Sequence, residues 1–293
     1  MALRHRGPKL LIHLVLILFG IMCIIPLISI ISISLSDETT ILKNGYSLLP
    51  QGFNFRAYSY VLYKPAQLLN ALKVSVLISL IGTILSLLIS AGISYVLSRE
   101  DYKYKNPLSF YVFFTMLFNG GLVPTYLLIS KYLHMKNTLW VLILPYLVIP
   151  WFILILRTFM QKIPHNIIES CHIDGASELR IFFQMILPLA KPGLATIGLF
   201  TILQYWNDWW LSLLYIEEEK FVPLQYMLYR MINNIEFLTR STNMMPPGMN
   251  NIILPAETAR MAMAILAAGP MLAVFPFFQK YFVKGLTVGA VKG

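Results

Sequence analysis

The sequence predicts an all-α membrane protein with six transmembrane helices. The first observation behind this is composition, because 57% of the 293 residues are hydrophobic and only 12% are charged. That charged content is about half of what a soluble domain carries. The second observation is the presence of apolar runs of about 20 residues, the length that a helix needs to cross the hydrocarbon core. Helices are expected because a backbone in lipid must satisfy its own hydrogen bonds.

Six apolar stretches are long enough to span a bilayer, and we expect them to form a single transmembrane domain over residues 1–293. They cover residues 10–35, 72–97, 108–128, 138–159, 192–215 and 260–278. Prolines inside or near these stretches predict kinks or short breaks; they are Pro26, Pro124, Pro145, Pro150, Pro270 and Pro276. The first stretch exceeds the roughly 7 to 15 apolar residues of a secretory signal, so we expect a retained helix.

The basic residues predict the orientation of the chain, since lysine and arginine collect on the cytoplasmic side of membrane proteins. With the N-terminus inside, that side receives Arg4, Arg6, Lys9, Arg99, Lys103, Lys105, Arg157, Lys162, Arg180, Lys191, Lys280, Lys284 and Lys292. Both termini are then cytoplasmic. The net charge of +10 is distributed at the ends of apolar runs rather than in one block, which favours this topological role over nucleic-acid binding.

The connections between the spans differ in character. Residues 36–71 and 216–259 are expected outside, with enough length for short surface helices. Residues 160–190 are expected inside, as two short helices at an angle. Pro164 can occupy the start of the first helix, Gly175 breaks it, and Leu187 with Pro188 ends the second.

The internal segment resembles the EAA coupling loop of permease subunits in ATP-binding-cassette importers. Glu169, Gly175, Leu187 and Pro188 match that pattern in register. Ser170 and Cys171 replace its two alanines, and Met185 replaces an isoleucine, which keeps these side chains small or apolar. The resemblance covers nearly the whole chain and implies the type I ABC importer permease fold with cytoplasmic EAA coupling helices.

Further motifs resemble a narrower branch of this family. Residues 173–177, Ile-Asp-Gly-Ala-Ser, and the C-terminal residues 282–293 are similar to the carbohydrate-uptake, maltose-permease-like branch. Residues 120–126, Gly-Gly-Leu-Val-Pro-Thr-Tyr, are similar to a subgroup of polysaccharide and complex-oligosaccharide permeases. The resemblance therefore implies import of a sugar oligomer. An acidic sugar, such as an alginate- or pectin-derived one, and a neutral sugar both remain open.

The resemblance also implies partners. These are a second homologous permease subunit, a cytoplasmic ABC ATPase dimer, an extracytoplasmic solute-binding protein, the oligosaccharide and membrane lipid, with no nucleic acid. ATP and Mg would bind to the ATPase, and this chain would be a non-catalytic subunit without a cofactor. The coupling residues would be Glu169, Asp174, Gly175, Ala176, Leu187 and Pro188. Glu169 would contact the ATPase, although an ordinary solvated helix charge is the simpler interpretation of that residue taken alone.

The fifth span carries a polar and aromatic sequence, Gln-Tyr-Trp-Asn-Asp-Trp-Trp at residues 204–210, roughly 18 to 27 Å along a helix from Pro192. A carboxylate at that depth is costly unless it faces protein or a water-filled cavity. We therefore expect Tyr205, Trp206, Asn207, Asp208 and Trp209 to line the sugar pathway, and Trp210 to belong to an interfacial aromatic belt. Helix-to-helix bonding is the alternative for the polar residues.

Two other features are ambiguous. Asn119, before Gly120 and Gly121, interrupts the third span and either faces the pathway or marks a structural break. His165, Glu169 and His172 share one helix face, a spacing that could bind zinc. However, the sequence contains no HExxH motif and the coupling pattern already explains Glu169, so we predict no metal site.

Other function classes lack their sequence signatures. There is no GxxxxGK[ST] phosphate loop and no GxSxG nucleophile motif. An ion-gradient-driven secondary sugar transporter is the alternative to an ATP-driven importer, and it would show inverted repeats with helices broken at the midplane. A membrane enzyme or receptor would need a catalytic constellation or a soluble domain. None of these features is evident.

Overall fold

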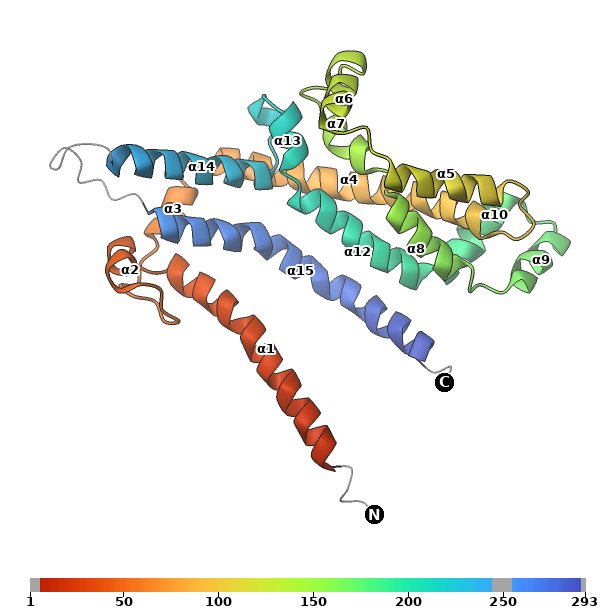
Figure 1. The fold of residues 1–293 in the computed structure, drawn as a ribbon, viewed down its shortest axis with the longest axis horizontal. Helices are drawn as coiled ribbons and strands as arrows, with labels where there is room; N and C mark the ends of the chain where they lie inside the picture. The colour runs from red at the N-terminus through yellow and green to blue at the C-terminus, as the bar shows by residue number, and fades with distance from the viewer. Residues whose placement is uncertain (1–5, 244–254, 291–293) are drawn as a thin grey trace. The chain divides into compact units, whose positions relative to one another are not determined.

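The computed structural model describes the backbone of residues 6–243 and 255–290 and the side chains of residues 12–240 and 255–279. The described residues form helices and connecting segments without a strand, which confirms the all-α prediction (Figure 1). The side chains of the sugar-branch motif at residues 282–293, together with Arg4, Arg6, Lys9, Lys280, Lys284 and Lys292, lie outside the described part.

The chain divides into two compact units. One comprises Met1–Leu68 and Leu228–Pro270, and the other comprises Leu69–Met227 and Met271–Gly293. Three long helices contribute residues to both; they are α4 (Pro65–Ser98), α14 (Leu224–Asn243) and α15 (Ala256–Ala290). The assignment of residues 1–293 to a single domain stays a prediction.

The first unit begins with α1 (Arg6–Ser34), an apolar helix that contains Pro26. Two short helices, α2 (Glu38–Asn44) and α3 (Arg56–Val61), follow it, so the expected helices in residues 36–71 are present. A buried carboxylate joins α2 to the start of α15. Glu38 accepts hydrogen bonds from the backbone N–H groups of Glu257 and Thr258, both at 2.9 Å. These donors are the unpaired N–H groups of a helix start, so Glu38 caps α15 from another segment.

The second unit contains the remaining helices. In chain order they are α5 (Lys105–Leu117), α6 (Leu122–Leu127), the π-helix η1 (Leu128–Tyr132), α7 (Trp140–Ile143), the 3-10 helix η2 (Leu144–Tyr146), α8 (Pro150–Met160), α9 (His165–Ile173), α10 (Glu178–Ile181), the π-helix η3 (Phe182–Ile186), α11 (Leu187–Leu189), α12 (Lys191–Asn207), α13 (Trp210–Tyr215) and the 3-10 helix η4 (Glu219–Phe221). Within this unit, α12 extends from α13 at one end toward α9 and α10 at the other (Figure 1).

Three helices are each long and apolar enough to cross a membrane, and bent helix pairs raise that number to as many as six among the described residues. The single helices are Ile12–Ser34 of α1, Pro65–Ser98 and Ala256–Gln279 of α15. The bent pairs are Lys105–Leu117 with Leu122–Tyr132 at 106°, Trp140–Tyr146 with Pro150–Met160 at 53°, and Glu178–Leu189 with Lys191–Asn207 at 80°. These lengths agree with a polytopic membrane protein.

Three of the predicted spans are interrupted rather than continuous. Residues 108–128 break between α5 and α6, where Gly121 has a φ of 84° that glycine adopts without strain. Residues 138–159 break before Pro150, as the prolines predicted. Residues 192–215 break at Asp208 and Trp209, because Asp208 has an extended backbone that ends α12 before α13 begins.

The core of the second unit joins α4, α8 and α12 to the segment after α8. Its buried residues are Ala91, Tyr95, Leu156, Met160, Ile168, Ile181, Phe182, Ile186, Ala190 and Ile197. Burial of such side chains is the main stabilising contribution of a packed helical core. The cluster therefore connects the segment at residues 165–189 to three membrane helices.

Candidate functional site

The segment predicted to couple the membrane helices to an ATPase forms a bent helical elbow. We call residues 165–189 the elbow: α9, the turn at Gly175, α10, η3 and α11. The helix α9 ends in a turn in which Gly175 has a φ of 76°. The N–H of Gly175 donates to the carbonyl of His172 at 3.0 Å, and the N–H of Ala176 donates to that of Cys171 at 2.9 Å. This pair of bonds is a Schellman motif, which turns the chain sharply and needs glycine at its left-handed position.

One face of the elbow is buried against the membrane helices. Ile168 of α9, Ile181 of α10 and Ile186 of η3 lie in the hydrophobic cluster with α4, α8 and α12. Ala176 and Leu187, two of the predicted coupling residues, pack partly against the same cluster. The elbow is therefore attached to these helices by side-chain packing rather than hanging from them as a loop.

The opposite face of the elbow is open. Ile173 is apolar, yet it is 86% exposed. The side chain of Glu169 is 61% exposed, and its Oε1 lies 3.0 Å from Nδ1 of His165 one turn earlier on α9. Asp174 and Pro188 are also exposed. Adjacent exposed apolar and charged groups on a short helix pair are typical of a protein interaction surface.

The end of the elbow differs from the prediction. Leu187 and Pro188 were expected to end the second helix, but the helical backbone continues through α11 to Leu189 and bends by 80° before α12. The π-helix η3 ends at Ile186, two residues before Pro188, which has no N–H to donate to the preceding turn. Wider helical turns of this kind often accompany a proline kink, so the bend falls at Ala190.

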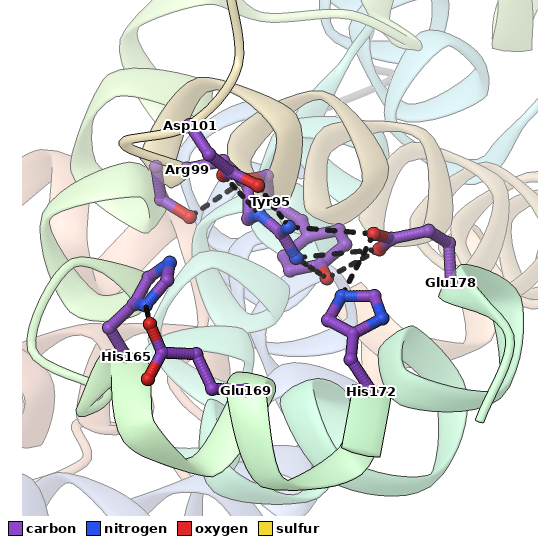
Figure 2. A network of polar contacts seen from close by, with 8 residues as sticks. Tyr95, Arg99, Asp101, His165, Glu169, His172 and Glu178 are labelled. Carbon is purple, nitrogen blue, oxygen red and sulfur yellow. Dashed lines mark hydrogen bonds and ion pairs between the residues drawn. The ribbon is translucent and has the colours of Figure 1, made fainter. Parts of the chain in front are cut away.

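A network of polar side chains connects the elbow to the end of α4 (Figure 2). The hydroxyl of Tyr95 donates to Glu178 Oε2 at 2.9 Å, and Arg99 Nη1 donates to the Tyr95 oxygen at 3.0 Å. Arg99 forms a bidentate pair with Asp101, at 2.7 Å from Nε and 2.5 Å from Nη2. His172 Nε2 lies 3.3 Å from Glu178 Oε1. Glu178 thus has polar contacts with Tyr95 of α4 and with His172 of α9.

The bidentate pair changes the protonation of its two members. The hydrogen bonds from Arg99 lower the pKa of Asp101 to about 2. Those to Asp101 raise the pKa of Arg99 above its ordinary value. Both groups are consequently charged throughout the physiological pH range.

The alternative of a zinc site on α9 has no support in the geometry. His165 faces Glu169, whereas His172 faces Glu178, so the two imidazoles pair with different carboxylates (Figure 2). Within the residues that the structure describes, no group of three or more His, Cys, Asp or Glu side chains could hold a metal ion.

A second candidate site is a cavity of about 360 Å³ where α12 ends. It is lined by Phe152, Phe200, Leu203, Gln204, Asn207, Asp208, Trp209 and Trp210. Three predicted pathway residues, Asn207, Asp208 and Trp209, therefore lie together. Asp208 accepts a hydrogen bond from the hydroxyl of Tyr146 at 2.8 Å and another from the N–H of Leu211 at 3.2 Å. Aromatic faces beside amide groups can stack on sugar rings and bind hydroxyls.

Three other predicted pathway residues lie elsewhere. Tyr205 is buried, and its hydroxyl donates to the carbonyl of Ile143 at 2.9 Å. Trp206 is buried as well. Asn119 is exposed, and its Oδ1 accepts from the N–H of Gly121 at 2.8 Å, which supports the break between α5 and α6. Trp210, for which an aromatic belt is predicted, is among the residues that line the cavity.

No sequence pattern predicts a functional role for Tyr95, Asp101 or Glu178. Arg99 is predicted only as one of the basic residues that set the orientation in the membrane. Arg99 and Asp101 are two residues apart, a spacing that could have indicated an ion pair. Glu178 lies 79 residues beyond Arg99, and nothing in the local sequence indicates that α4 and α10 meet. That contact follows from the tertiary packing of the elbow.

The chain is similar to known proteins. The family model described as "Binding-protein-dependent transport system inner membrane component" matches residues 104–288. The chain is 36% identical over 291 residues to YtcP of Bacillus subtilis, described as a polygalacturonan/rhamnogalacturonan transport system permease protein, covering 99% of this chain and 100% of that protein. It is 37% identical over 274 residues to Protein LplC of Bacillus subtilis, covering 94% of this chain and 91% of that one.

The fold is similar to a chain of known structure. That chain comes from the crystal structure of a bacterial ABC transporter involved in the import of the acidic polysaccharide alginate. The TM-score is 0.79 at 26% sequence identity, and the match covers 96% of this chain and 99% of the other.

Proposed function

Because the chain belongs to the family of binding-protein-dependent transport system inner membrane components, we propose that it is the permease subunit of an ATP-binding-cassette importer for acidic oligo- or polysaccharides. In this role the chain forms one half of a pathway through the cytoplasmic membrane. A second permease chain forms the other half.

The two-faced elbow is the observation that carries the ATP-driven part of this proposal. Its outer face presents Glu169 and Ile173 to a partner, while Ile168, Ile181 and Ile186 are packed among α4, α8 and α12. A partner that binds the outer face and changes conformation would move the membrane helices, because close-packed side chains transmit a displacement of the elbow to them. The proposed partner is a cytoplasmic ATPase dimer, which binds ATP and Mg and hydrolyses the nucleotide.

The proposed subunit has no catalytic role of its own. Its sequence contains no GxxxxGK[ST] loop to cradle a nucleotide phosphate. Its residues position and move helices, while ATP binding and hydrolysis in the ATPase supply the free energy. An extracytoplasmic solute-binding protein would deliver the sugar.

The acidic substrate class is supported by the relatives. YtcP is described as a polygalacturonan/rhamnogalacturonan permease, and the structural neighbour imports alginate. Polymers of uronic acids carry both sugar-ring faces and carboxylates. In this chain, the cavity at the end of α12 offers Trp209 and Trp210 for stacking and Gln204 and Asn207 for hydroxyl groups. No lysine or arginine lines it, so the charge of the carboxylates would be met elsewhere in the importer.

The proposed orientation places both termini and the elbow in the cytoplasm. It follows from the lysine and arginine residues that flank the apolar stretches. Arg99, Lys103 and Lys105 lie between α4 and α5, and Lys162 and Arg180 lie in or beside the elbow. With Cys23 and Cys171 replaced by serine, a membrane-impermeant maleimide should label Ile173→Cys only after the membrane is opened.

Reconstitution tests the function directly. The importer, assembled in proteoliposomes from both permease chains, the ATPase and the binding protein, should hydrolyse ATP faster with uronate oligosaccharides than with neutral oligosaccharides of equal length. Equal stimulation by both sugars would contradict the acidic substrate. Hydrolysis that is independent of any oligosaccharide and binding protein would contradict sugar import altogether.

A further inference from the structure

Glu178 is the first residue of α10, and it is the acidic centre of the network between the elbow and α4. Tyr95 donates to it from the last turns of α4 at 2.9 Å. Arg99, which follows α4, lies 3.5 Å from both of its carboxylate oxygens. His172 approaches it from α9 at 3.3 Å. One carboxylate therefore joins the membrane helix to both arms of the bend, as Figure 2 shows.

Packing between α4 and the second arm of the elbow is incomplete beside this network. A cavity of about 500 Å³ lies there. Its lining includes Gly92 and Val96 from α4, and Leu179, Phe182 and Phe183 from α10 and η3. The rings of Tyr95 and Phe182 are in contact, with centroids 5.6 Å apart. An open cavity of this size removes van der Waals contacts from the side chains that line it. The polar bonds of Glu178 therefore add to the packing of Tyr95 against Phe182 in holding this arm to α4.

Substitution of Glu178 would not leave the largely buried charge of Arg99 unpaired, because Arg99 also pairs with Asp101. The side chain of Arg99 is 11% exposed, and its bidentate partner Asp101 stays in place when Glu178 is substituted. Loss of a partner is most destabilising when it leaves a charge uncompensated. Since Asp101 compensates Arg99, substitution of Glu178 is expected to break the connection and to preserve the fold.

We infer that Tyr95, Arg99 and Glu178 form a tether through which movement of the elbow reaches α4. This inference rests on the proposed importer function and adds positioning residues to it. Among the described residues, Glu169 pairs within α9, with His165, and its side chain is exposed, so it belongs to the side that binds the ATPase. Glu178 lies on the side of the elbow that contacts α4. Glu169 and Glu178, which lie on either side of Gly175, thus have separate roles.

The test measures sugar transported per ATP hydrolysed in the complete importer in proteoliposomes. The variants form a graded series: Tyr95→Phe removes one hydroxyl, Glu178→Gln removes the charge, and Glu178→Ala removes all bonds to the carboxylate. Glu100→Gln is the matched control, because Glu100 is an exposed carboxylate beside Arg99 that takes part in no ion pair among the described residues.

The tether predicts that Glu178→Ala lowers sugar transported per ATP about fivefold, the size of a typical coupling between sites. Tyr95→Phe and Glu178→Gln should lower it less, and Glu100→Gln should match the wild type. Tyr95→Phe combined with Glu178→Ala should fall no further than Glu178→Ala alone, because the bond between them is already lost. An unchanged ratio in Glu178→Ala would overturn the inference. Dissociation of the ATPase from the Glu178→Ala importer would do so too, since the residue would then serve assembly.

A distance measurement separates failure of the tether from failure of the sugar assignment. Spin labels at Gln184→Cys on η3 and Leu88→Cys on α4, both exposed positions, are introduced with Cys23→Ser and Cys171→Ser. The distance distribution in the assembled importer is recorded with and without a non-hydrolysable ATP analogue. Glu178→Ala should broaden the distribution relative to Glu100→Gln, whatever sugar the importer carries. Equal widths in the two variants would refute the tether even if sugar import were established.

Discussion

The ring of Tyr205 on α12 lies directly against Gly82 on α4. A Cβ atom placed on Gly82 would stand 2.5 Å from Cζ of that ring, which is closer than real side chains approach. The hydroxyl of Tyr205 continues past α4 to the carbonyl of Ile143. Three helices, α4, α7 and α12, therefore meet at one ring, and only glycine leaves room for it.

Gly82→Ala should destabilise the protein by about 1 to 3 kcal/mol, because the added methyl group overpacks this contact. Gly92→Ala on the same helix is the control, since a Cβ there meets nothing within 4 Å. Alanine is favoured over glycine in a helix by about 1 kcal/mol, so Gly92→Ala should keep or raise stability. Thermal unfolding of the detergent-solubilised chain measures both. Similar midpoints for the two variants would contradict the close contact.

Gly175→Val should weaken the elbow, while Gly175→Asn should be tolerated. The φ of 76° at this position is strained for a β-branched residue and accessible to asparagine. A Cβ at Gly175 meets nothing within 4 Å, so the effect is conformational rather than steric crowding. We expect a loss of about 1 to 3 kcal/mol from valine, detected as reduced co-purification of the ATPase. Equal co-purification of the Val and Asn variants would argue against the need for a left-handed residue.

Asp101 should contribute stability that depends on pH. Its pKa is lowered to about 2 from an ordinary value of 3.8, so its contribution is complete above pH 4 and is lost as the pH falls toward 2. The side chain is 53% exposed, which limits the contribution to about 1 kcal/mol or less. Wild type should therefore unfold at a higher temperature than Asp101→Asn at pH 6. A difference that persists at pH 2 would mean that the charge of Asp101 is not the cause.

Many of the helices and breaks can be predicted from residues that are close together in the sequence. The apolar runs predict the membrane-spanning helices, and Pro164 and Gly175 bracket α9 because their backbone preferences act within a single turn. The break at residues 119–121 is also local, because Asn119 and two glycines produce it without help from the rest of the chain.

The remaining features depend on residues far apart in the chain. Tyr205 has the composition of a pathway residue, yet Gly82 on α4 provides the space that buries it. Asp208 was predicted to line the sugar pathway; its extended backbone also ends α12, and its carboxylate accepts a hydrogen bond from Tyr146, 62 residues earlier. The helical backbone continues through η3 and past Pro188 to Leu189, and buried residues of η3 pack in the hydrophobic cluster with distant helices. Tertiary packing decides each of these outcomes.

Glu169→Ala should leave the permease in the membrane and reduce sugar-stimulated ATP hydrolysis, because the proposed contact of this carboxylate is with the ATPase. His165→Asn is the matched control, since it removes the same pair at 3.0 Å while keeping the carboxylate. An exposed pair one turn apart stabilises a helix by about 0.3 to 0.5 kcal/mol, so the control should have little effect. If both variants lost activity equally, the pairing within α9 would explain Glu169 and its outward role would be wrong.

A substitution in the cavity at the end of α12 can test whether the transported sugar is negatively charged. Asn207 is exposed beside Asp208 and Trp209, so Asn207→Asp adds a second carboxylate to the lining without a large change in side-chain size. Repulsion between nearby like charges of about 1 kcal/mol corresponds to roughly a fivefold change in rate or affinity. Uptake of a uronate oligosaccharide should therefore fall about fivefold more than uptake of a reduced, neutral oligosaccharide of the same length. Asn207→Ala should slow both sugars alike, because it removes a hydrogen-bonding group and adds no charge. Equal losses for both sugars in Asn207→Asp would place the carboxylates of the substrate away from this chain.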